Sequence, residues 1–99
     1  MIVVLASFRL PQAALARART LIPDVIAATR AEAGCHSYDM GEDVLEAGLF
    51  RVSELWEAPQ HLAAHLASPH MNEWNKGRAE MGMTERRIRV FEVEGEIGA

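Results

Sequence analysis

The order in which two hydrophobic periodicities follow one another restricts the fold of this chain more than any other feature. Residues 2–8 form a β-branched, apolar run that is typical of a strand buried on both faces. Residues 11–33 repeat apolar side chains every three or four positions, which predicts a helix. Pro11 suits the first helical turn and Gly34 a helix end, while Pro23 predicts a kink or break.

A hairpin is predicted next. Residues 35–40 and 49–56 both alternate, and an acidic turn bounded by glycines separates them. In the first strand we expect one face to carry His36, Tyr38 and Met40. In the second we expect one face to carry Phe50, Val52, Glu54 and Trp56.

The last third of the chain predicts helices and then a strand. Pro59 opens a helix whose apolar stripe includes Leu62 and Leu66. Ser68 and Pro69 predict the capped start of a short helix that runs to about residue 76 or 77. Residues 86–94 alternate as a fourth strand, with Ile88 and Val90 on one face and Arg87, Arg89, Phe91 and Val93 on the other.

The order β-α-β-β-α-β predicts one α+β domain over residues 1–99 with ferredoxin-like topology. Right-handed crossovers give a four-stranded antiparallel sheet in the order 4-1-3-2, with the helices on one face. The other face is then bare although the first strand is apolar on both sides. We therefore expect a homodimer in which two such faces pack through an isologous contact.

Charge and composition exclude several classes of protein. Ten basic residues stand against 14 acidic ones, a formal charge of −4, which argues against binding to nucleic acid. The middle strands also lack the stacking aromatic residues of RNA-binding sheets. No apolar run approaches the roughly 20 residues of a membrane span, and no signal peptide is recognisable, so a cytoplasmic protein is expected.

The histidines are the first candidates for chemistry, because residues 55–70 hold three of the four. His61 and His65 have the i,i+4 spacing of metal ligands. However, no glutamate follows His61, the first histidine of the pair, and no third ligand is evident. We therefore expect that the two rings bind no metal and face solvent. His65 and His70 border a helix junction, where they either bond backbone carbonyls or act as a base towards a phenol-like substrate.

The aromatic residues have two interpretations as well. Phe50 and Trp56 are either core residues or the walls of a flat aromatic pocket, and Met71 and Trp74 either pack or form its lid. Tyr38 would contribute a hydroxyl at the strand edge. The carboxylate of Glu54 needs a partner, for which Arg89 or an arginine of a second subunit is the candidate.

Three motifs in register resemble the antibiotic biosynthesis monooxygenase family. They are Glu32-Ala33-Gly34-Cys35 with Tyr38, then Glu54-Leu55-Trp56, then His65 with Ser68 and His70. The resemblance extends from the first strand to the fourth.

This resemblance implies a dimeric α+β barrel that oxidises phenols, hydroquinones or related aromatics with molecular oxygen and without a cofactor. It implies His65 or His70 as the base and Trp56 as a group that orients the ring. It also implies Arg89 as the charge that offsets a substrate anion. Together with the pocket interpretation above, we expect Phe50, Tyr38, Met71 and Trp74 around the substrate.

The chain departs from the family pattern at several places. Val52 stands where the aromatic oxygenases carry asparagine, which also leaves a non-catalytic, ligand-binding dimer open. Ser7 in the first strand, with Trp74 and Asn75 in the last helix, disfavours haem degradation.

A regulatory amino-acid-binding module is a third possibility for the topology. No glycine-rich phosphate loop or dinucleotide fingerprint supports a flavin or nicotinamide site.

Overall fold

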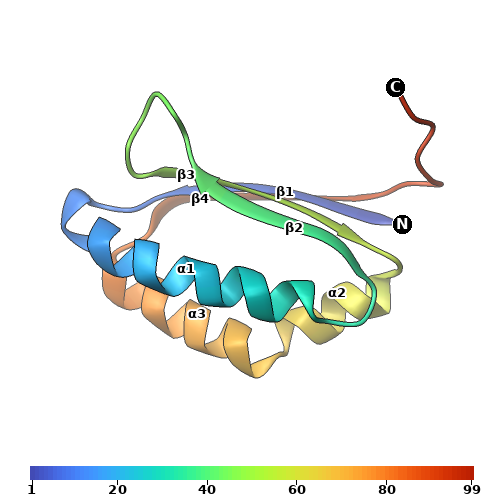
Figure 1. Cartoon of the computed structure of the whole chain (residues 1–99), viewed down its shortest axis with the longest axis horizontal. Coiled ribbons are helices and arrows are strands. Elements are labelled where there is room, and N and C mark those ends of the chain that lie inside the picture. Colours follow the sequence, from blue (N-terminus) through green and yellow to red (C-terminus); the bar gives the residue numbers. More distant parts are fainter.

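A four-stranded antiparallel sheet carries all the helices on one face in the computed structural model, which describes residues 1–99 (Figure 1). The strands are β1 (Ile2–Arg9), β2 (Cys35–Glu42), β3 (Leu49–Trp56) and β4 (Thr84–Glu92). The helices are the short 3-10 turn η1 (Gln12–Ala14), α1 (Leu15–Arg30), α2 (Pro59–Leu66) and α3 (Pro69–Met81). The sheet order is β2-β3-β1-β4, so the predicted fold class and strand order are confirmed.

The core lies between the sheet and α1 and α3. Phe8 of β1 stacks on Phe50 of β3 with ring centroids 5.2 Å apart, and Trp74 of α3 packs on the Phe8 ring. Ala18, Ile22 and Val25 complete this layer from α1. Apolar burial of this kind is the main favourable contribution to folding.

Helix α1 passes through Pro23 without a break, so of the two predicted outcomes, a kink or a break, the break is wrong. Pro23 lies on the exposed side of the helix. The carbonyl group of Arg19, which loses its intrahelical donor, therefore faces water that can replace it. The proline thus costs less here than it would on the buried side.

Several element boundaries and one strand face differ from the prediction. The helix expected over residues 11–33 begins with the 3-10 turn η1 and continues as α1 only over Leu15–Arg30. Helix α3 ends at Met81 rather than near Gly77, because Gly82, at φ +83°, caps it and Gly77 is buried inside it. Strand β4 begins and ends two residues earlier than expected. An irregularity between Cys35 and Ser37 in β2 turns the Cys35 side chain to the core, so exposed His36 does not share the face of Tyr38.

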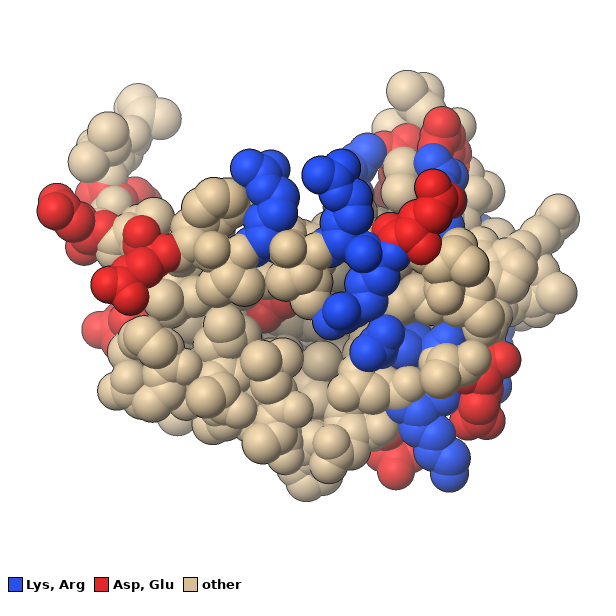
Figure 2. All heavy atoms as spheres, turned by 180° about the vertical axis from the view of Figure 1, so that it is seen from behind, with Lys and Arg blue, Asp and Glu red and all other residues tan.

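The opposite face of the sheet has no cover within this chain. Leu5 on β1 is 41% exposed and Phe91 on β4 is 38% exposed, so β1 is buried on its helix side only. A hollow of about 830 Å³ on this face contains Arg51, Arg87 and Arg89, and Figure 2 shows basic side chains standing out from it. No helix in the chain has the length and apolar character needed to cross a membrane.

Replacing Gly34 by alanine is expected to lower the free energy of unfolding by about 1–3 kcal/mol, since other residues are strained at positive φ. Gly34 has φ +77°, and an added Cβ would lie 2.2 Å from the His61 ring. Urea denaturation measures the change. Gly41→Ala is the matched control, because nothing lies within 4 Å of a Cβ at that position. Equal losses in both variants would contradict this account of the turn.

Candidate functional site

The α2–α3 junction places two histidines side by side. His65 lies in the last turn of α2, and its carbonyl oxygen accepts a 2.6 Å hydrogen bond from Ser68 Oγ. The same Ser68 oxygen caps α3 by accepting from the Met71 amide at 3.4 Å. His70 is the second residue of α3. One serine therefore fixes both helix ends and, with them, the two imidazoles.

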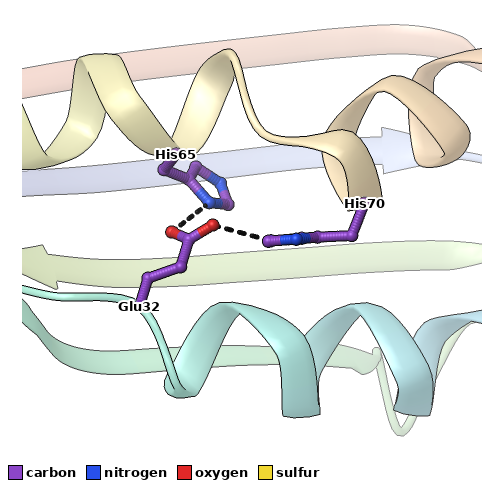
Figure 3. Close-up of side chains that lie close together, drawn as sticks. All are labelled: Glu32, His65 and His70. Carbon is purple, nitrogen blue, oxygen red and sulfur yellow. Dashed lines mark hydrogen bonds and ion pairs between the residues drawn. The ribbon is translucent and has the colours of Figure 1, made fainter.

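Glu32 approaches this pair from the end of α1. It follows the last turn of that helix, where its amide donates to the Thr29 carbonyl at 3.0 Å. Its carboxylate lies between the two rings (Figure 3). Oε2 lies 2.9 Å from His65 Nδ1, and Oε1 lies 2.7 Å from His70 Nε2.

The two contacts of Glu32 differ in quality. The contact with His65 is an aligned hydrogen bond, in which the imidazole N–H donates because a carboxylate can only accept. Oε1 is close to His70 but off its N–H direction, so this buried oxygen lacks an aligned donor. A rotation of the His70 ring would align it, as often happens when a site fills.

A second carboxylate lies on the inner side of His65. Glu54 of β3 accepts a 2.9 Å hydrogen bond from the Trp56 indole N–H, and Glu54 Oε1 is 4.0 Å from His65 Nε2. The Trp56 and Tyr38 rings lie 4.8 Å and 5.6 Å from the His65 ring. His65 is thus enclosed by two aromatic rings and two acidic side chains.

Burial sets the charge of this interior. It lowers the pKa of His65, against the opposing effect of Glu32, so the imidazole favours its neutral form. It raises the pKa of the Glu54 carboxyl, and it raises the pKa of Tyr38 strongly. His65 therefore has a proton on Nδ1 and a lone pair on Nε2 towards Glu54.

The structure brings together four of the residues that the sequence singled out: Tyr38, Trp56, His65 and His70. Phe50, Met71 and Trp74 are buried core residues. Arg89 pairs with Leu5 on the uncovered face and lies over the Phe91 ring at 5.1 Å. Within one chain, therefore, Arg89 is neither the partner of Glu54 nor a charge beside His65.

Two expectations for α2 are wrong. His61 is half-buried rather than solvent-facing, because its ring lies against Gly34 and its Nδ1 is buried without a partner. Leu66 is 54% exposed while His65 is 1% exposed, so the histidine takes the inward position assigned to the leucine. The junction with α3 rotates this last turn towards the core.

Glu32 is the residue that sequence reasoning missed, although it begins the first of the three motifs. The sequence feature that points to Glu32 is its position two residues before a glycine that ends a helix. Local sequence patterns do not predict that this helix end packs against α2. The partner of Glu54 was missed as well, since it is Trp56 two residues along the same strand.

Glu32, His65 and His70 are also the residues that could hold a metal ion, since their ligand atoms lie within 4.8 Å of one another. Two histidines and a carboxylate suit zinc or iron. Here His65 Nδ1 and His70 Nε2 lie 2.9 Å and 2.7 Å from different oxygens of the Glu32 carboxylate (Figure 3). The three side chains therefore contact one another directly as a His–Glu–His cluster.

Of the three main hollows of the molecule, one reaches this cluster. A groove of about 510 Å³ between α1 and α3 is lined by His70 and Trp74. The hollow on the uncovered sheet face and a smaller one of about 400 Å³ near the chain ends contain no histidine. His65 and Trp56 line none of the three.

Comparisons agree with the motifs. Residues 1–77 match the model of the antibiotic biosynthesis monooxygenase family. A protein from Deinococcus radiodurans, named a putative antibiotic biosynthesis monooxygenase, is 25% identical with a TM-score of 0.92, over 100% of this chain and 98% of that one. Rv0793 from Mycobacterium tuberculosis is 28% identical with a TM-score of 0.86, over 98% of each chain. No curated protein matches the chain.

Glu54→Gln is expected to stabilise the protein at pH 8 by on the order of 1 kcal/mol, because the amide keeps an acceptor for Trp56 without burying a charge. Burial raises the pKa of Glu54, so the wild-type free energy of unfolding falls as pH rises above the carboxyl's ordinary range. The advantage should disappear towards pH 4. Urea unfolding across this range measures it, and a difference that did not change with pH would contradict the assignment.

Proposed function

Because the chain belongs to the antibiotic biosynthesis monooxygenase family, we propose that it is a cofactor-independent monooxygenase acting on a small aromatic such as a quinol or phenol. The observation that carries the proposal is the His–Glu–His cluster. It offers two imidazoles backed by one carboxylate, with one imidazole buried and the other partly exposed. Carboxylate-backed histidines are effective bases near neutral pH.

A base suffices to start this chemistry. Molecular oxygen reacts slowly with neutral closed-shell phenols, but a phenolate is electron-rich enough to donate one electron to it. The phenoxyl radical and superoxide combine to a hydroperoxide, and loss of water leaves a carbonyl. Overall, a phenol with a free para position and O2 give a quinone and water, so the substrate itself supplies the electrons. The protein must remove the proton, stabilise the anion and exclude water.

Oxygen uptake tests the proposal. Purified protein incubated with a panel of hydroquinones and phenols should consume oxygen above the buffer rate. A phenol with a free para position should give the quinone and water, and a hydroquinone the hydroxyquinone and water. Removing the acting base should lower the rate by about 10²-fold or more, so either His65→Gln or His70→Gln should show this loss. His36→Gln is the matched control, because His36 is exposed on β2 and pairs with Glu57 outside the cluster. The absence of uptake with every substrate, or an equal loss in the control, would count against the proposal.

A homodimer is part of the same proposal. The uncovered sheet face exposes Leu5 and Phe91 and also contains both signs of charge, including an Arg51–Asp43 pair at 3.4 Å. Two such faces related by a two-fold axis would bury the apolar residues of both copies.

Leu5→Glu is expected to convert the dimer into a 10.9 kDa monomer, because it places a charge at the centre of the buried face. Sedimentation velocity at micromolar concentration measures this. Ala27→Glu, on the exposed side of α1, should leave the dimer intact. A wild-type protein that sediments only as a monomer would refute the dimer.

The second candidate function is a non-catalytic dimer that binds a small aromatic. Val52 favours it, because this buried side chain stands where aromatic oxygenases of the family carry a polar asparagine. A ligand identified by native mass spectrometry that stays unchanged under oxygen would support this alternative.

A further inference from the structure

We propose that the groove between α1 and α3 is the substrate site and that His70, positioned by Glu32, is the base that faces it. This inference rests on the proposed function and adds the place, the base and the positioning residue. The groove is about 510 Å³, within the range of small-molecule sites.

Accessibility separates the two histidines. The side chain of His70 is 25% exposed and that of His65 is 1% exposed. His70 is also the only histidine that lines any of the three hollows. A phenol in the groove can therefore reach His70, whereas the rings of Trp56 and Tyr38 enclose His65.

The groove has the composition that a flat phenol requires. Leu21, Val25 and Trp74 supply apolar surface, and Trp74 is almost fully buried, so its ring is held in place. Gly77 lines the groove without a side chain, and an added Cβ would already be in van der Waals contact with the Leu21 side chain, at 3.5 Å. Larger side chains at that position would fill the space between the helices.

The charges at the rim favour an anion at one position. Arg17 is paired with Glu80 across the groove at 3.7 Å, whereas Lys76 makes no ion pair. Lys76 is therefore the cation available to a phenolate. The acidic neighbours Asp24 and Glu73 also line the groove and disfavour substrates that already carry a negative charge.

The proton transfer follows from this arrangement. The substrate O–H bond breaks, an N–H bond forms on His70, and the electron pair stays on the phenolate oxygen. His70 Nε2 lies 2.7 Å from Glu32 Oε1 and is hydrogen-bonded at 3.3 Å to Ser68 Oγ, whose own proton goes to the His65 carbonyl oxygen. Nε2 of the neutral ring therefore carries the proton, and Nδ1 is the nitrogen left to accept one from the substrate. The Glu32 carboxylate stabilises the resulting imidazolium, and His65, kept neutral by burial, holds Glu32 through its other oxygen.

Binding of 4-nitrophenol tests the site separately from oxidation, because this electron-poor phenol resists oxidation and its phenolate is yellow. The wild-type protein should bind it with an increased phenolate fraction compared with free probe at the same pH. Gly77→Leu should weaken binding at least 10-fold, while Ala27→Leu, exposed on α1 and not lining the groove, should not change it. Circular dichroism establishes that each variant is folded.

Two variants that keep the groove open test the charges. Glu32→Gln and Lys76→Gln should retain binding within about threefold but lose the increase in the phenolate fraction. Glu32→Gln should also shift the pH profile of oxygen uptake, which a purely structural role would not do. If the variants give these binding results but no quinol causes oxygen uptake, the groove is supported as the binding site and the proposed oxygenase activity is refuted.

Three results of the 4-nitrophenol experiments would overturn the inference. They are the absence of 4-nitrophenol binding, binding that Gly77→Leu leaves unchanged, and an unchanged phenolate fraction in both Glu32→Gln and Lys76→Gln. Stoichiometric zinc in the purified protein that is lost in His70→Ala would also overturn it, because the cluster would then be a metal site.

Discussion

The carboxylate of Glu32, shared between two imidazoles, is the interaction on which the rest of the site depends. A buried carboxylate is costly unless it is hydrogen-bonded, and here His65 bonds one oxygen while His70 adjoins the other. The sharing makes the two histidines unequal. His65 is enclosed and hydrogen-bonded to Glu32, whereas His70 borders the groove and has one ring nitrogen free. A single acidic residue therefore links the core of the domain to its surface.

The backbone around the site explains how these groups meet. Gly34 reverses the chain after α1 at a positive φ and leaves no side chain where the His61 ring lies, so the end of α1 approaches α2 closely. Ser68 joins α2 to α3 and accepts from the α3 amide, which fixes the spacing of His65 and His70. The site is thus made of three helix ends, whose positions the sheet and the aromatic core hold. Changes at either turn would move the imidazoles relative to Glu32 without touching them.

Periodicity alone predicted the fold well, because strand faces and helix stripes follow from local pattern. Phe50, Val52, Glu54 and Trp56 do share the helix-facing side of β3, and the sheet order is as expected. The errors arose where tertiary contacts override local signals. The irregularity in β2 separated His36 from Tyr38, the junction turned His65 inward in place of Leu66, and packing against α1 carried α3 past Gly77. The role of Glu32 depends on a contact across 33 residues, which no local pattern contains.

Long-range ¹⁵N NMR of the histidine side chains at neutral pH tests the central claim most directly, because nitrogen shifts report which ring nitrogen carries a proton. We predict a neutral His65 protonated on Nδ1 towards Glu32, and a His70 whose Nε2 carries a proton. A His65 protonated on Nε2 or on both nitrogens would contradict this prediction, as would shifts that identify a metal-bound nitrogen in either ring.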